Sequence, residues 1–239
     1  LDALVINAEN ASDGAGLMPR QYRRLIDAGV DGMTMGDHIY RRKELIEILK
    51  QSERIVRPAN YPGDASGRTW MVLPTPAGPL GVISLLGRVF MRPVDCFFDA
   101  VDAAIEQMRQ RTDGGSSMPI LVDMHAEATS DKQVLARYLD GRVTAVLGTH
   151  THVPTADASI LPGGTAFQCD VGMTGPYASI IGRDISRVTQ TTRTFEPCHF
   201  HVATADVRLC GAMVETSQTG QAESITRFEQ SVPPQETST

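Results

Sequence analysis

Seven side chains that bind metals readily follow apolar runs in this chain of 239 residues. They are Glu9, Asn10, Asp37, His38, His125, His150 and His152. Imidazole, carboxylate and amide groups together suit a borderline transition metal such as Zn, Mn or Fe. Because this set exceeds what one tetrahedral ion uses, it predicts two metal ions. Two ions about 3.5–4 Å apart can hold the attacking and leaving oxygens of a phosphoryl displacement.

The spacing within this set favours the same interpretation. His150 and His152 are two residues apart, so in an extended loop both imidazoles can face one cavity or serve two neighbouring ions. A carboxylate such as Glu9 can bridge two cations through its two oxygens. Each motif alone is weak, because Gly-Asp is common in turns and a lone histidine more often hydrogen-bonds within a loop. Their joint occurrence after four apolar runs is what indicates a metal site.

The elements that must position these residues alternate between strand and helix. Apolar runs predict strands at residues 4–8, 30–35, 119–124 and 143–147. Helical spacing is found at residues 19–29, 45–49, 97–108 and 130–139, the last beginning with a capping box of Ser130 and Gln133. In an open α/β sheet, ligands bind outside the carboxyl ends of the strands. We therefore expect the four strands to deliver the site residues to one rim.

The rest of the chain favours β-structure. Residues 68–73 and 80–86 flank a Pro/Gly turn, which predicts a hairpin. Helical patterns weaken after the histidine motif, and short runs at 199–207 and 212–216 suggest antiparallel strands. We expect one α/β domain over residues 1–229 and a disordered tail over 230–239, whose composition suits no packed element.

Composition narrows the class of protein. The formal net charge of −6 argues against stable nucleic-acid binding, which needs a basic face. No apolar run approaches the ~18 residues of a membrane-spanning helix. The four cysteines form no C-x-x-C pair and are interpreted as reduced thiols, which predicts a cytoplasmic protein.

The ordered motifs resemble those of the calcineurin-like metallophosphoesterases. Asn7-Ala8-Glu9-Asn10, Gly36-Asp37-His38, His125 and the stretch 148–152 match the family's acidic, G-N-H, H and G-H-x-H motifs in order. The closer resemblance is to the YmdB-like branch, bacterial metal-dependent phosphodiesterases acting on cyclic nucleotides, including 2′,3′-cyclic AMP. Further similar stretches are residues 8–16, 85–91, 123–130, 148–157 and 174–182, and the resemblance covers about residues 3–229.

The resemblance implies a role for each site residue. Glu9 would bridge two metal ions, and Asn10 and His152 would bind the first ion. The second ion would be held by Asp37, His125 and His150. His38 would be the general acid that protonates the leaving alkoxide. The ions would be Fe or Mn, with Zn as an alternative.

The resemblance also implies a fold and a reaction. The fold would be a four-layer α/β sandwich, in which two mixed β-sheets are flanked by helices. The reaction would be hydrolysis of 2′,3′-cyclic nucleotides or similar small phosphodiesters by a hydroxide activated between two metals. Two alternatives remain open: a phosphomonoesterase on the same site, and a weakly catalytic regulatory protein that affects gene expression or RNA turnover. Assembly into a homo-oligomer is also left open.

Two features differ from the family pattern. The family's first metal ligand is an Asp after a first strand, and we expect both to belong upstream of Leu1, where the chain enters a strand at once without a Met. Asp37 stands where the family usually has Asn. An added carboxylate either strengthens cation binding or repels the phosphate, and the sequence does not decide between the two.

Several further polar residues are candidates for supporting roles. Arg57, Asn60 and Arg88 could face the substrate, although a structural ion pair is an equal alternative for Arg88. Asp123 or Glu127 is expected to orient an imidazole through its second nitrogen. Loop capping is expected of Asp157 and Asp170, and a structural or solvent-facing place of His199 and His201.

Overall fold

The central layer of the protein is a six-stranded sheet with the order β4-β5-β6-β7-β9-β8, seen in a computed structural model that describes residues 1–111 and 117–233. Its strands are β4 (Trp70–Thr75), β5 (Gly78–Leu86), β6 (Ile120–His125), β7 (Ala145–Thr149), β8 (Ser159–Ile160) and β9 (Ala166–Gln168). The four inner strands are parallel, and β4 and β8 are antiparallel to their neighbours. The predicted hairpin is confirmed as β4–β5, with Thr75 paired to Gly78 at the turn.

Two helices cover one face of this sheet, α3 (Phe97–Arg111) and α4 (Thr129–Leu139). The alternation along β6 explains how the sheet is buried on both sides. Ile120, Val122 and Met124 pack in the cluster that contains the buried residues of α3 and α4. Leu121, between them, packs against clusters on the opposite face.

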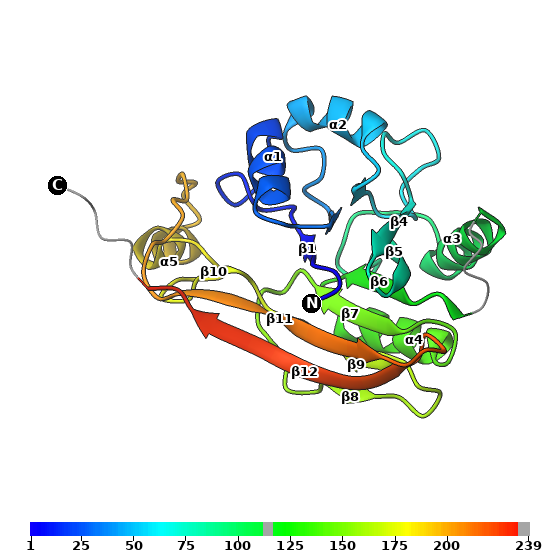
Figure 1. The fold of residues 1–239 in the computed structure, drawn as a ribbon. Coiled ribbons are helices and arrows are strands. Elements are labelled where there is room, and N and C mark those ends of the chain that lie inside the picture. Colours follow the sequence, from blue (N-terminus) through cyan, green and yellow to red (C-terminus); the bar gives the residue numbers. More distant parts are fainter. Residues whose placement is uncertain (112–116, 234–239) are drawn as a thin grey trace.

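Two three-stranded sheets lie against that opposite face (Figure 1). One is parallel and consists of β1 (Val5–Asn7), β2 (Gly32–Thr34) and β3 (Ile55–Val56). The other is antiparallel and consists of β10 (Gly175–Pro176), β11 (Val207–Thr216) and β12 (Ala222–Ser231). Small side chains allow the second sheet to approach closely, since Ala145, Ala166 and Ala222 form one buried cluster.

The outermost layer covers β1–β3 and consists of α1 (Pro19–Asp27), the short helix η1 (Lys43–Leu45) and α2 (Ile46–Gln51) (Figure 1). Helix α1 begins with Pro19 at its first position and is followed by Gly29 at φ 94°, as the sequence predicts. The layers therefore run helix, sheet, sheet, helix. This confirms the predicted sandwich, with one sheet layer divided into the two smaller sheets.

Four local predictions differ from the structure. The strand predicted at residues 199–207 is reduced to an isolated bridge at Val202, and β11 begins only at Val207. Helix α5 (Ile185–Thr194) was not expected, because its threonine-rich sequence carries no strong apolar stripe; the carboxylate of Asp184 caps it by accepting from Arg187 N. Helix α4 begins at Thr129 after Ala128 without a side-chain cap, so the predicted capping box is wrong. Strand β12 continues to Ser231, two residues into the predicted tail, because Gln230 and Ser231 still pair with β11. Residues 234–239 of that tail lie outside the described residues.

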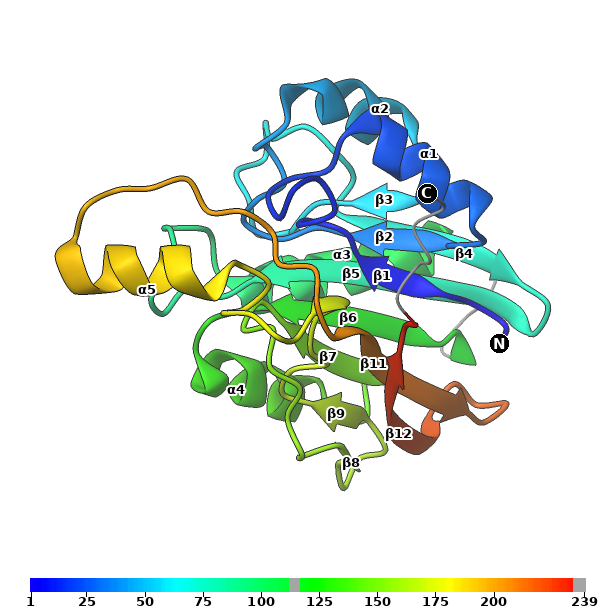
Figure 2. The ribbon, with the colours of Figure 1, turned by 90° about the vertical axis from the view of Figure 1, so that its left-hand side faces the viewer.

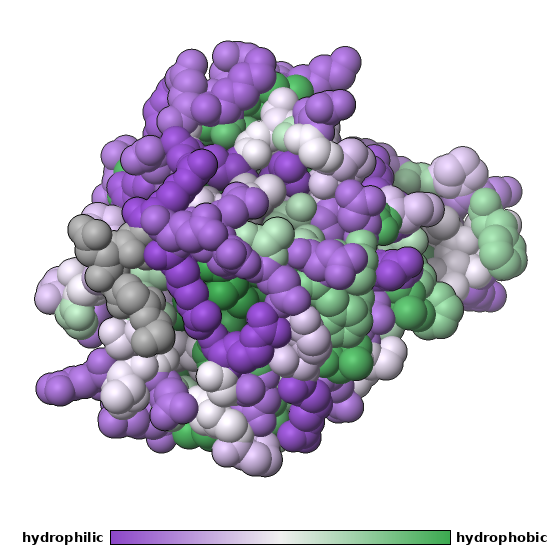
Figure 3. Space-filling model, turned by 90° about the vertical axis from the view of Figure 1, so that its right-hand side faces the viewer, coloured by the Kyte–Doolittle hydropathy of each residue, from purple (hydrophilic) through white to green (hydrophobic). Residues whose placement is uncertain are grey.

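Hydrophilic side chains cover most of the face shown in Figure 3, with smaller apolar areas between them. Within residues 1–111 and 117–233, no helix combines the length and apolar character needed to span a membrane. All four cysteines are free thiols.

Candidate metal centre

The predicted site residues lie where parallel strands end. In Figure 2, β1, β2 and β3 run toward the side of the molecule on which α5 lies. Glu9 follows β1 and Asp37 follows β2, each within three residues of the strand end. His125 is the last residue of β6, and His150 comes directly after β7. One rim thus receives side chains from four strands that are far apart in the sequence.

Four of these side chains converge on one point, and we call them the carboxylate–imidazole cluster: Glu9, Asp37, His125 and His150. Each offers one ligand atom, and the four atoms lie within 4.8 Å of one another. His125 Nε2 is 3.3 Å from Glu9 Oε2 and 3.3 Å from Asp37 Oδ1. His150 Nδ1 is 3.0 Å from the same His125 nitrogen. Two imidazoles and two carboxylates at these distances could hold a transition-metal ion.

The electrostatics of the cluster fit a cation site. Burial opposes ionisation of Glu9, but the charge and hydrogen bond of His125 outweigh burial and lower the pKa of Glu9. Asp37 is also desolvated, yet its hydrogen bond to His125 and the nearby imidazoles hold its pKa well below the usual range. Burial alone would lower the pKa of His125, whereas Glu9 and Asp37 raise it to about 10. The buried carboxylate of Glu9 and the half-buried carboxylate of Asp37 thus favour a positive charge between them.

The remaining predicted ligands form a second group beside the cluster. Asn10 Nδ2 is 3.2 Å from Glu9 Oε1 and 3.2 Å from His152 Nε2. The amide oxygen of Asn10 is 2.7 Å from His38 Nδ1. One oxygen of Glu9 therefore faces the cluster, and its other oxygen faces Asn10. This is the arrangement that a bridging carboxylate requires.

The backbone at the rim is unusual in ways that bring these groups together. Gly36 lies so close to the cluster that a Cβ there would overlap His125 and Glu9, so only glycine fits. His150 and His152 have φ values of 97° and 66°, in the left-handed region that side chains rarely adopt. The predicted extended loop is therefore wrong. The loop makes a strained turn, so that His150 faces His125 of the cluster and His152 faces Asn10.

The half-buried hydroxyl of Thr149 and the buried carboxylate of Asp123 orient the imidazole of His125. His125 Nδ1 is 2.8 Å from Thr149 Oγ1, and that hydroxyl donates to Asp123 Oδ1 at 2.7 Å. Asp123 also accepts from Thr34 Oγ1 and Asn7 Nδ2 through its other oxygen. Because Thr149 donates to Asp123, its oxygen accepts from His125 Nδ1–H, which directs Nε2 at the cluster, where it can bind a metal ion once it gives up its own proton. Asp123 thus acts on the imidazole as expected, through a threonine that the sequence did not single out.

An ion pair beneath the histidine loop was not foreseen. Lys132 Nζ lies 2.9 Å from Asp170 Oδ2, and both side chains are 1% exposed. The same carboxylate oxygen accepts from the backbone N–H and the hydroxyl of Thr151, at 3.0 and 2.7 Å. Thr151 is the residue between His150 and His152. Asp170 therefore fixes the loop that presents both histidines, in keeping with its predicted structural role.

A second clamp holds the other edge of the site. The carbonyl oxygen of Ile181 lies 3.1 Å from His152 Nδ1, so it can accept a hydrogen bond from Nδ1–H and leave Nε2 facing Asn10. The guanidinium of Arg183 donates to the carbonyls of Asp13 and Gly14, at 3.0 and 2.8 Å, in the loop that follows Asn10. Ile181 and Arg183, just before α5, thereby connect the loop that carries His152 with the loop that follows Asn10.

The other candidates have mixed outcomes. The prediction that Arg57 and Asn60 face the substrate is wrong, because both are buried and bind backbone carbonyls, including those of Pro58 and Leu86. Arg88 is exposed, and its guanidinium forms no ion pair within the described part of the chain. Glu127 Oε2 contacts His150 Nε2 at 3.2 Å.

Two further predictions concern residues away from the cluster. His199 and His201 are exposed and contact each other edge to face, as expected of solvent-facing residues. Asp157 accepts from Cys169 N, which confirms its loop-capping role.

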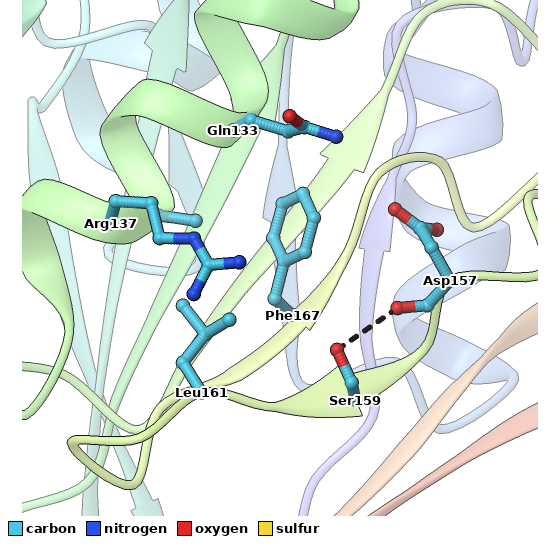
Figure 4. A pocket seen from close by; sticks show the side chains of 7 residues that line it. Gln133, Arg137, Asp157, Ser159, Leu161 and Phe167 are labelled. Atoms are coloured by element: carbon cyan, nitrogen blue, oxygen red, sulfur yellow. Dashed lines mark hydrogen bonds between the residues drawn. The ribbon is translucent and has the colours of Figure 1, made fainter.

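A shallow groove elsewhere on the surface shares no residue with the centre. It lies between α4 and β8–β9 and is lined by Gln133, Ala136, Arg137, Asp157, Ser159, Leu161 and Phe167. Figure 4 shows Arg137 and Gln133 on α4 beside Phe167, and Ser159 bonded to the backbone of Asp157. The groove brings together no pair of titratable groups suited to catalysis. The rim is therefore the candidate functional site.

Comparison with known proteins agrees with this geometry. The family model described as YmdB-like protein matches residues 1–228. The chain belongs to the YmdB-like family. A Bacillus subtilis (strain 168) member, named 2′,3′-cyclic-nucleotide 2′-phosphodiesterase, is 42% identical over 225 residues, which cover 94% of this chain and 83% of that protein.

Solved structures of the same fold are known. A crystal structure of a hypothetical protein from Thermus thermophilus has a TM-score of 0.90 and 41% identity, covering 98% of this chain and 89% of that one. A structure titled as a novel phosphatase from Mycoplasma pneumoniae has a TM-score of 0.86 and 30% identity, covering 96% and 82%. The comparisons thus establish both the sandwich fold of this chain and its membership of the YmdB-like family.

Proposed function

We propose that this chain is a metal-dependent phosphodiesterase that hydrolyses 2′,3′-cyclic nucleotides or similar small phosphodiesters. The observation that carries the proposal is the carboxylate–imidazole cluster, whose four ligand atoms lie within 4.8 Å of one another at the rim. The name of the Bacillus subtilis relative, 42% identical, supports the substrate class. We further propose that the protein works in the cytoplasm.

Two metal ions fit the donor set that the rim provides. Asp37, His125 and His150 would hold one ion, and Asn10 and His152 would hold the other. Glu9 would bridge the two ions, because its Oε2 faces His125 and its Oε1 faces Asn10. The mixture of nitrogen and carboxylate ligands suits Fe or Mn, with Zn as an alternative. When bound, such ions supply an activated water and neutralise charge on the phosphoryl oxygens.

His38 is proposed as the general acid. Its Nδ1 is 2.7 Å from the amide oxygen of Asn10, which accepts the Nδ1 proton and fixes the ring. Its Nε2 lies 3.8 Å from Asp37 Oδ2, and the side chain is 29% exposed, so a substrate can reach it. The water gives up a proton to the surrounding solvent as its oxygen forms a bond to phosphorus, the bond from phosphorus to the ribose 2′ oxygen breaks, and Nε2–H of His38 gives its proton to that oxygen. The product is then a 3′-phosphate.

The test compares two histidine variants after loading with Mn. His38→Ala is expected to lower kcat on 2′,3′-cyclic AMP by about 10²–10⁴-fold, the usual contribution of a general acid. Metal content should stay at the wild-type value, because His38 is not among the proposed ligands. The matched control is His199→Ala, which removes an exposed histidine outside the rim and should retain full turnover. Unchanged turnover in His38→Ala would exclude this residue as the acid.

A phosphomonoesterase on the same site is the second candidate, since the Mycoplasma pneumoniae structure is titled as a phosphatase. The two candidates predict different products from 2′,3′-cyclic AMP. A phosphodiesterase opens the cyclic diester and stops at the nucleoside monophosphate, whereas a phosphomonoesterase leaves the diester intact and releases inorganic phosphate only from a monoester such as 3′-AMP. Chromatography of the nucleotides combined with a phosphate assay separates the two.

A further inference from the structure

A short loop after β5 is attached directly to the metal centre. At its start, Gly87 N donates to the carbonyl oxygen of His125 at 2.9 Å. Toward its end, the sulfur of Met91 accepts from Glu127 N at 3.4 Å. The side chain of Glu127 in turn contacts His150 Nε2. Residues 87–91 therefore form part of the rim itself, and we call them the rim loop.

The conformation of the rim loop is fixed by hydrogen bonds to its backbone. Asp131 is buried, and its Oδ2 accepts from both Arg88 N and Val89 N, at 2.8 and 3.0 Å. A Cβ at Gly87 would overlap Ala126, so the loop start is seated tightly against the strand that carries the site. The loop is thus held in place without burying the side chains at its middle.

The side chain of Phe90 is 88% exposed, against 41% for its neighbour Val89. Its φ of 62° is in the left-handed region, where a bulky residue is rarely found. Phe195 is equally exposed and also left-handed, but it ends helix α5, where that conformation is ordinary. Phe90 follows no helix, so neither burial nor capping accounts for its conformation.

The other residues near the site share this backbone feature. His150, His152 and Ile181 all have positive φ, and each contributes a contact at the rim. Backbone strain in folded proteins gathers at functional sites, where the position of a side chain matters more than its stability cost. Phe90 fits this pattern as an exposed aromatic side chain on a loop whose backbone is bonded to the rim.

We propose that Phe90 stacks on the nucleobase of the substrate while the cyclic phosphate occupies the metal centre. This inference rests on the proposed function, since it assumes a nucleoside phosphodiester. An aromatic ring offers a base a flat apolar face, and such stacking tolerates every base. The rim loop therefore supplies affinity for the nucleoside part of the substrate, while the chemistry stays with the metal-binding groups and His38.

The test uses two substrates that differ only in the base. One is 2′,3′-cyclic AMP, and the other is methyl riboside 2′,3′-cyclic phosphate, which has no base to stack. Phe90→Ala is expected to raise KM for the nucleotide by about tenfold, equivalent to about 1.4 kcal/mol. Its kcat on the nucleotide and both constants on the base-free substrate should be unchanged, and Phe90→Trp should restore the nucleotide KM.

The matched control is Phe228→Ala, which truncates a phenylalanine that is 40% exposed on β12, outside the rim loop. It should leave both substrates unaffected. If Phe90→Ala changed KM equally for both substrates, or for neither, the stacking inference would be overturned. The proposed phosphodiesterase activity would be unaffected by that result. The inference would also be overturned if Phe90→Ala formed a smaller assembly in solution than the wild type while its ratio of KM values for the two substrates stayed the same. That result would assign Phe90 to an interface between copies of the chain. Failure of the wild type on both substrates would instead refute the proposed function, and the inference with it.

Discussion

Replacing Lys132 by Met is expected to weaken the fold and the metal centre together. The ammonium of Lys132 lies 2.9 Å from Asp170, and each side chain is 1% exposed, so solvent cannot substitute for the lost cation. Asp170 would remain buried and charged. Its bonds from Thr151 and Gly172 would persist, because they do not involve Lys132.

The magnitude follows from this geometry. Removing one partner of a buried ion pair costs about 3–5 kcal/mol. Since Asp170 keeps hydrogen bonds from three donors, we expect the lower end, about 3 kcal/mol. In a domain of this size each kcal/mol lowers Tm by about 2–4 °C, so Lys132→Met should melt about 6–12 °C below the wild type.

Thermal unfolding followed by circular dichroism measures this change. The matched control is Lys50→Met, which breaks an exposed pair with Glu47 at 3.0 Å and should cost less than about 1 kcal/mol. The double variant Lys132→Met with Asp170→Asn removes the stranded charge and should recover about half of the lost stability. A double variant as unstable as Lys132→Met alone, or a single variant that melts like the control, would refute the reasoning.

Two further outcomes are expected. Thr149→Val removes the hydroxyl between His125 and Asp123 and should weaken metal binding about 10–100-fold, measured by calorimetry. Thr149→Ser keeps the hydroxyl and should bind metal with the wild-type affinity. Equal metal affinity in the two variants would refute the orienting role of Thr149. Tyr61 is buried, its hydroxyl has no hydrogen-bond partner within the described residues, and burial raises its pKa to about 12. A raised pKa means that the folded state holds this proton more tightly, so its stability contribution is complete below pH 10 and is lost as pH rises toward about 12. Tyr61→Phe should therefore be at least as stable as the wild type at pH 7 and lose less stability between pH 9 and 11.5 in urea titrations; parallel losses would contradict this.

The site could be predicted in large part because its donors follow directly from strand ends. Glu9, Asp37, His125 and His150 each stand within three residues of a strand terminus, and parallel strands bring such positions to one rim. The layers could be predicted for a similar reason, since apolar runs and helical spacing are local patterns. Strands and helices of this kind can be predicted from a short stretch of sequence alone.

The supporting contacts could not be predicted, because they join distant residues of ordinary type. Thr149 looks like the end of a strand, and only the fold places Asp123 against it. Lys132 occupies a helix position where a solvent-exposed lysine is normal, yet its partner Asp170 is 38 residues away. The left-handed backbone of His150 was missed because sequence offers no sign of strain in a residue with a side chain.

The origin of the ligands in distant segments also bears on how the protein folds. Glu9 follows a strand of the β1–β2–β3 sheet and His150 follows a strand of the six-stranded sheet, so the two meet only when these sheets pack together. Parallel strands within each sheet pair through contacts that are far apart in the chain. The cluster is therefore among the last features to form, and no stretch of the unfolded chain presents its four ligands together. A metal ion held by the cluster would accordingly stabilise the finished fold by mass action and slow its unfolding, while the folding rate would depend on the sheets.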